Sequence, residues 1–150
     1  MPDQLSTGPQ LREPEVNTTF LLAQATAGLR RRIHDGVAAM GHPIRPAHAA
    51  VFINIDSEGT RLTQLADRAV MTPQAMGELV DDLVEWGYVT RVPDPTDRRA
   101  KLIMLTEAGR QCVSAGINSI GDIERRIDDA LGVRRHRDLR RMLLKLLAQS

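Results

Sequence analysis

The fold is decided by the stretch from Tyr88 to Gly109, YVTRVPDPTDRRAKLIMLTEAG. Two segments of it, 88–92 and 101–105, are rich in β-branched and apolar residues, as β-strands are. Between them, the segment PDPTDRR at 93–99 combines turn residues with two arginines. We therefore predict a β-hairpin with a long, basic-tipped loop, followed by a helix that starts after Thr106.

A helix-turn-helix unit is predicted just before this hairpin. A short helix within residues 60–69 would place its leucines and alanines on one face. Thr72 can cap a following helix that has Pro73 at its first position, and Gly87 would end that helix. Two helices joined by a turn of three to four residues have the form of a helix-turn-helix.

Amphipathic helices are predicted on both sides of this central unit. One starts at Asn17 or Thr18 and ends at Gly41, and a second covers 47–55. After the hairpin, one helix reaches Gly132, and the last starts at about Arg135. Their apolar stripes are too long for residues 46–106 alone to bury, so we predict a two-fold homodimer. The alternative is that both stripes fold back onto the central unit of one chain.

Length and composition limit the other possibilities. A chain of 150 residues fits one domain, predicted at 17–150, with 1–16 as a flexible arm. Lys+Arg number 20 and Asp+Glu 19, so any nucleic-acid site must be a local patch. No apolar run has the length of a membrane span, and the N-terminus lacks a signal peptide, so we expect a cytoplasmic protein without a membrane partner.

Metal and cofactor chemistry is not indicated by the sequence. The single cysteine, Cys112, can form neither an internal disulfide nor a thiolate cluster. The four histidines lack the helical spacing of a metal site, and the chain has no Gly-rich phosphate loop. We also find no nucleophile elbow or catalytic triad, so we do not expect an enzyme.

Several motifs resemble those of the MarR family of bacterial transcription regulators. They are LTQLA at 62–66, MTPQAM at 71–76, LVDDL at 79–83, GYVTR at 87–91, DPTDRRA at 94–100 and LTEAG at 105–109. The resemblance implies a mainly α fold with a small β-hairpin wing. This fold is a winged helix-turn-helix at 46–106, flanked by N- and C-terminal dimerisation helices at 17–45 and 107–150.

The resemblance also implies double-stranded DNA as the partner, with the helix from Pro73 in the major groove. Its outward-facing first turn would present Thr72, Pro73, Gln74, Ala75 and Glu78. We expect Gln74 to read bases, because its amide can pair bidentately with adenine, and Glu78 could accept from cytosine. The alternative for Gln74 is an ordinary solvated residue.

At the wing, the family pattern makes Arg99 the residue that enters the minor groove and Asp97 the carboxylate that orients the tip. Arg98 could contact phosphate or pair with Asp94 or Asp97. The alternative is a surface turn whose charges compensate one another. Further candidates for phosphate contacts that position the protein are Arg61, Thr63, Gln64 and Arg91.

Four acids on the expected recognition helix oppose deep docking on DNA. They are Glu78, Asp81, Asp82 and Glu85. The later acids could point away from DNA or be neutralised by arginines such as Arg68 and Arg91. Their charge predicts weak non-specific affinity.

The function we expect is that of a homodimeric repressor released from a pseudo-palindromic operator by a small ligand, for example an aromatic one. The ligand is implied by the family resemblance alone. Phe20, His48 and Phe52 could line its crevice, although such residues are more often part of a core. Cys112 is expected to be a buried, inert thiol. The alternative function is a winged-helix protein-interaction module without DNA binding.

Overall fold

The structure is a computed structural model that describes residues 17–149; the predicted arm at 1–16 lies outside this part of the chain. Ten elements follow one another. They are α1 (Thr18–Ala39), the 3-10 helix η2 (Pro46–His48), α2 (Ala49–Asn54), β1 (Thr60–Arg61), α3 (Leu62–Arg68), α4 (Pro73–Glu85), β2 (Val89–Asp94), β3 (Asp97–Leu105), α5 (Glu107–Leu131) and α6 (Val133–Leu147).

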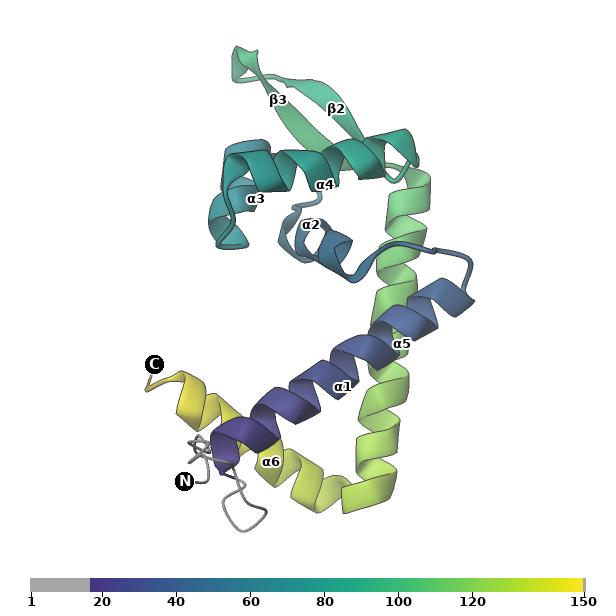
Figure 1. Cartoon of the computed structure of the whole chain (residues 1–150), viewed down its shortest axis with the longest axis vertical. Coiled ribbons are helices and arrows are strands. Elements are labelled where there is room, and N and C mark those ends of the chain that lie inside the picture. The colour runs from purple at the N-terminus through teal and green to yellow at the C-terminus, as the bar shows by residue number, and fades with distance from the viewer. Residues whose placement is uncertain (1–16, 150) are drawn as a thin grey trace, which may run out of the picture.

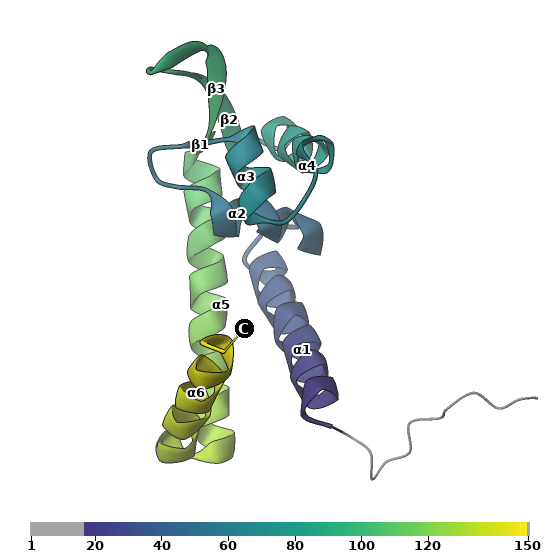
Figure 2. The ribbon, with the colours of Figure 1, turned by 90° about the vertical axis from the view of Figure 1, so that its left-hand side faces the viewer.

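The elements form a head and a stalk (Figure 1). The head consists of α2, α3, α4 and an antiparallel sheet of order β1-β3-β2. Helix α5 runs from β3 to the opposite end of the molecule, α1 crosses it, and α6 packs beside its far end (Figure 2). The mainly α winged helix-turn-helix fold is therefore confirmed.

Local capping chemistry explains why the helices begin and end near the predicted residues. The side chains of Asn17, Thr72 and Thr106 each accept a hydrogen bond from a backbone N–H in the first turn of their helix. Gly87 and Gly132 follow α4 and α5 with φ of 76° and 80°, a conformation that favours glycine. These boundaries depend on neighbouring residues alone, so the sequence predicts them.

The sheet differs from the prediction at β1. Thr60 and Arg61, expected to begin a helix, instead pair with Ile103 and Leu102 of β3. Thr60 is fully buried, and its hydroxyl accepts a hydrogen bond from the backbone N–H of Asp56 at 2.8 Å. This long-range pairing adds a third strand to the wing sheet.

The wing tip is also tighter than the predicted long loop. Strands β2 and β3 continue to Asp94 and Asp97, which pair across a two-residue turn, Pro95–Thr96. The Asp94 carboxylate accepts hydrogen bonds from the Thr96 backbone N–H at 2.8 Å and from its hydroxyl at 2.7 Å. These bonds close the turn and place Arg98 and Arg99 at the start of β3 rather than in a loop.

Helix α5 packs against α1 through mostly small side chains. The buried face of α5 presents Cys112, Ala115 and Ser119, together with Ile123. Ile117 and Ile120 are 63% and 47% exposed in the single chain. Helices α1 and α5 cross closely here: a Cβ added at Gly36 would lie only 2.3 Å from Ser119 Oγ.

Two alanine substitutions on α1 test this close crossing. Gly36→Ala should lower the free energy of unfolding by about 1–3 kcal/mol, because the added methyl group displaces Ser119. Gly28→Ala is the matched control: nothing lies within 4 Å of its Cβ, so helix propensity should raise stability by up to about 1 kcal/mol. Urea titrations measure both values, and equal effects would contradict the close approach.

Apolar side chains stay exposed along the stalk. Met142 and Leu147 of α6 are 55% and 72% exposed although α6 packs against α5. The alternative in which the outer stripes fold back onto the central unit of one chain is therefore wrong for the described residues. No helix between residues 17 and 149 is long and apolar enough to cross a membrane.

Candidate nucleic-acid interface

The first turn of α4 is open to solvent at its N-terminal tip. Thr72 Oγ1 accepts the Ala75 N–H at 3.2 Å, and Pro73 has no N–H to offer. The backbone N–H and side-chain amide of Gln74 therefore stay available at an exposed position. Of the other candidates, Glu78 is exposed and Ala75 is half-buried. This tip can present one backbone donor and one bidentate amide to a ligand.

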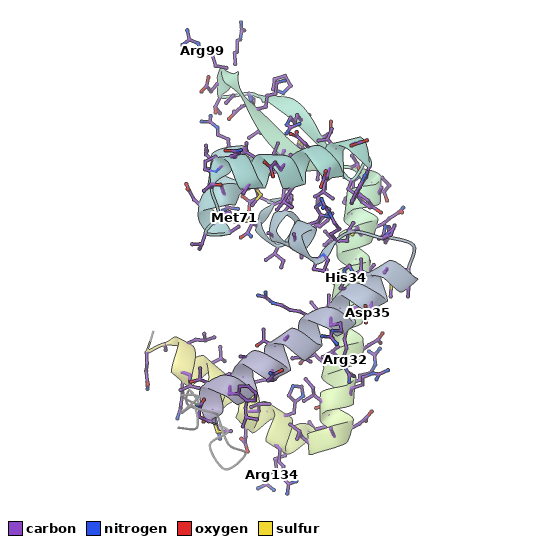
Figure 3. All side chains as sticks on the ribbon, in the orientation of Figure 1. Arg32, His34, Asp35, Met71, Arg99 and Arg134 are labelled. Carbon is purple, nitrogen blue, oxygen red and sulfur yellow. The ribbon has the colours of Figure 1, made fainter. Side chains whose placement is uncertain are left out.

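The turn before α4 contains an unusual backbone conformation. Val70 has a φ of 54°, and among the described residues it is the one non-glycine with a positive φ. Its side chain is 93% exposed, whereas the next residue, Met71, is half-buried and packs against the core (Figure 3). The Met71 N–H donates to the carbonyl of Ala66 at 2.9 Å, which fixes the turn between α3 and α4.

Two predicted phosphate contacts, Arg61 and Arg91, are held by carboxylates. Arg61 binds the Asp94 carboxylate through Nε at 2.7 Å and Nη2 at 2.6 Å. Arg91 Nη2 lies 2.6 Å from Asp81 Oδ1. Both arginines therefore brace the wing within the chain, and their side chains are 37% and 31% exposed.

The other two phosphate candidates lie in the first turn of α3, and both are exposed. Gln64 Oε1 accepts the Arg61 N–H at 3.2 Å, and its amide N–H groups donate no hydrogen bond to the described residues. Thr63 precedes it on the same exposed turn.

The Asp94 carboxylate is the electrostatic anchor of the wing. Hydrogen bonds from the Thr96 side chain and backbone, together with those from Arg61, lower the pKa of Asp94 to about 2. Because the folded-state pKa lies below its ordinary value of 3.8, the stabilising effect is present above about pH 4 and is lost as the pH falls toward 2.

Asp94→Asn should flatten the acid limb of the stability curve. The variant has no carboxylate to protonate at this position, so it should lose less unfolding free energy than the parent chain between pH 4 and pH 2. Urea unfolding at several pH values measures this difference. Parallel curves for the two proteins would show that Asp94 is not the group that titrates.

Arg98 and Arg99 form the exposed tip of the wing. Neither side chain makes a hydrogen bond or ion pair with the described residues, so Arg98 pairs with neither Asp94 nor Asp97. Asp97 Oδ1 accepts the Arg99 backbone N–H at 3.0 Å, which fixes the strand where both arginines project. Arg99 extends away from the rest of the molecule (Figure 3). The tip thus presents two cationic groups to solvent.

The acids of α4 are only partly neutralised within the chain. Asp81 pairs with Arg91, as expected, whereas Arg68 pairs with Asp56 at 2.9 Å instead of an acid of α4. Arg68 lies at the end of α3, beside the turn that contains Asp56. Glu78 and Glu85 form no ion pair with the described residues.

Asp82 has partners that the sequence analysis missed. Its carboxylate binds the guanidinium of Arg45 and lies 3.1 Å from Nε2 of the fully buried His48. The His48 hydrogen bond is the main factor that lowers the pKa of Asp82. Burial opposes it, and the charge of Arg45 adds to the lowering. His48 and Asp82 are 34 residues apart, and no local sequence signal links them.

The residues suggested for a ligand crevice are not brought together. Phe20 is exposed near the start of α1, whereas His48 is buried in the head and Phe52 packs edge-on against Tyr88. Cys112 is 3% exposed, and burial raises its pKa to about 11, as expected for an inert thiol. Within residues 17–149, no cluster of three His, Cys, Asp or Glu side chains could hold a metal ion.

A helix-turn-helix followed by an antiparallel hairpin with exposed arginines defines the class of winged-helix DNA-binding domains. A model of the MarR family matches residues 42–100. The transcriptional regulator HosA of Escherichia coli O111:H- is 31% identical over 98 residues, which cover 63% of this chain and 72% of HosA. An uncharacterized protein of Mycobacterium tuberculosis is 31% identical over 128 residues, 82% of this chain and 88% of its own.

Among solved structures, the transcriptional repressor CouR bound to a 23-mer DNA duplex has a TM-score of 0.72 and 25% identity. The match covers 95% of this chain and 98% of CouR. CouR from Rhodococcus jostii RHA1 bound to p-coumaroyl-CoA matches with a TM-score of 0.67 and 25% identity, over 87% of this chain and 91% of CouR. The chain belongs to the MarR family, whose members are transcriptional regulators.

Proposed function

We propose that the chain is a cytoplasmic, homodimeric repressor that binds a pseudo-palindromic operator. The observation that carries this proposal is the pair of exposed arginines at the wing tip, which lies on the side of the head away from the stalk (Figure 1). Arg99 would enter the minor groove and Asp97 would hold its backbone, while Arg98 would meet phosphate.

The tip of α4 would read the major groove. Gln74 is the proposed base reader, Thr72, Pro73 and Ala75 shape its turn, and Glu78 would accept from a cytosine amino group. Thr63 and Gln64 would contact phosphate. Arg61 and Arg91 would add phosphate contacts through the portions of their side chains that stay exposed beside their carboxylate partners. CouR, which binds a DNA duplex and is similar over nearly the whole chain, supports this assignment.

Dimerisation would bury the apolar surface of the stalk. Ile117 of α5 and Met142 and Leu147 of α6 are all more than half exposed in the single chain. A second copy would cover them by two-fold symmetry and would pair the two heads on one duplex. A small ligand, for example an aromatic one, would release the operator; the structure of CouR with p-coumaroyl-CoA supports a ligand-controlled regulator.

Selection from random duplex DNA at two salt concentrations tests this function. We expect enriched pseudo-palindromes with half-site centres about 10–10.5 bp apart. Gln74→Ala should relax the selected sequence more than it lowers affinity for random DNA, because it removes a base contact rather than a charge. Failure of the parent chain to enrich any sequence would contradict the proposal.

The alternative is a protein-interaction module without DNA binding. The exposed Glu78 and Glu85 on α4 favour it, since they form no ion pair with the described residues and would repel phosphate. Absence of DNA binding at both salt concentrations would favour this function instead.

A further inference from the structure

His48 is fixed on both sides of its ring. Its Nδ1 accepts the backbone N–H of Arg45 at 3.0 Å, at the start of η2. The other nitrogen, Nε2, therefore carries the proton and donates to Asp82 Oδ2 at 3.1 Å. The ring has no exposed surface, so both of its polar atoms are satisfied by protein alone.

The last turn of α4 and the residue that follows it, its C-cap, hold this ring. Asp82 bonds its edge, and Trp86, four residues later, packs against it in a T-shaped arrangement with ring centroids 4.9 Å apart. Arg45 adds a charge-assisted bond to the same carboxylate. Rotation or sliding of α4 relative to η2 would break at least one of these contacts.

The contacts lie where the stalk joins the head. Residues 40–45 lead from α1 directly into η2, and His42 in this connection also contacts the Tyr88 hydroxyl at 3.3 Å. Gln74 lies eight residues before Asp82, which is about 12 Å along a helix. A tilt of about 10° around Asp82 would therefore displace the reading tip by about 2 Å, enough to lose a base hydrogen bond.

We propose that Arg45, His48 and Asp82 form a positioning joint that sets the direction of the recognition helix relative to the stalk. The joint contacts no DNA itself. Its effect on operator binding rests on the proposed function, but its effect on the geometry of the head does not. In a dimer, two such joints would set the distance between the two recognition helices.

Distances between spin labels test the joint without DNA. Labels at Gln74→Cys on α4 and Arg31→Cys on α1 report the angle between helix and stalk. Cys112 stays unlabelled because it is buried, and excess unlabelled protein isolates distances within one chain. Asp82→Ala should shift or broaden the distance distribution by about 2 Å or more. Glu85→Ala removes the same charge from the same helix but no contact of the joint, so it should match the parent chain.

Asp82→Asn separates positioning from charge. The variant keeps an acceptor for His48 Nε2 and should therefore restore the label distances of the parent chain. The melting temperature of every variant is measured as a control for folding. His48→Leu, which removes both ring nitrogens and so leaves the Arg45 N–H and the Asp82 carboxylate without this partner, gives a second reading if Asp82→Ala does not fold. Equal distributions for Asp82→Ala, or for His48→Leu in its place, and Glu85→Ala would overturn the joint.

Operator binding gives an independent reading. Asp82→Ala should lower affinity for the selected operator about tenfold, while its affinity for random duplex matches that of Glu85→Ala. If the parent chain selects no operator, the proposed function fails, and the label distances still decide whether the joint exists.

Discussion

Replacing Arg99 by alanine should weaken DNA binding about ten- to a hundredfold near physiological salt. The side chain is exposed at the wing tip and carries no partner among the described residues, so its charge is available to the minor groove. Loss of one cationic contact per protomer should also reduce the slope of log affinity against log salt by about one per protomer. Titrations of the selected operator at four salt concentrations measure both quantities.

Arg125→Ala is the matched control for this loss of charge. Arg125 is exposed and pairs with Asp122 in the C-terminal part of α5, a helix that runs away from the wing (Figure 1). Its replacement should leave the salt slope unchanged. An unchanged slope for Arg99→Ala as well would remove Arg99 from the interface.

Gly109→Ala should lower the free energy of unfolding by about 3 kcal/mol or more. A Cβ at this position would lie 2.1 Å from the carbonyl oxygen of Tyr88, a backbone atom that no change of side-chain rotamer can move away. The same carbonyl accepts hydrogen bonds from the Thr106 N–H at 3.1 Å and from its hydroxyl at 3.0 Å. The LTEAG motif is thus a close junction between the wing and α5.

Gly116→Ala controls for the substitution itself. It lies on the same helix, and the nearest atom to its Cβ is a Val37 methyl carbon at 3.9 Å, an ordinary contact. We expect stability to stay the same or rise by up to about 1 kcal/mol. Urea unfolding compares the two variants, and similar values would contradict the special role of Gly109.

Local chemistry explains most of what the sequence predicts correctly. The caps at Asn17, Thr72 and Thr106 and the glycine at 87 act on neighbouring residues, so their patterns fix the helix boundaries. The wing arginines were placed by the family motif, and the structure gives them the expected exposure.

Contacts between distant residues account for the features that the sequence did not predict. Thr60 forms a strand because of Ile103, 43 residues away, and the ion pair of Arg61 with Asp94 joins residues 33 apart. The close crossing of α1 at Gly36 selects small residues for the buried face of α5, which the spacing of apolar residues along α5 does not reveal. The partners of Asp82 likewise follow from packing of η2 against α4, which no local pattern encodes.

The most direct test is the mass of the protein–operator complex together with the effect of a five-base-pair insertion between the half-sites. We expect two chains per duplex in sedimentation, since each half-site requires one head. The insertion should abolish the high-affinity complex, because it rotates one half-site by about half a helical turn. One chain per duplex, or equal affinity after the insertion, would contradict a paired reading of DNA.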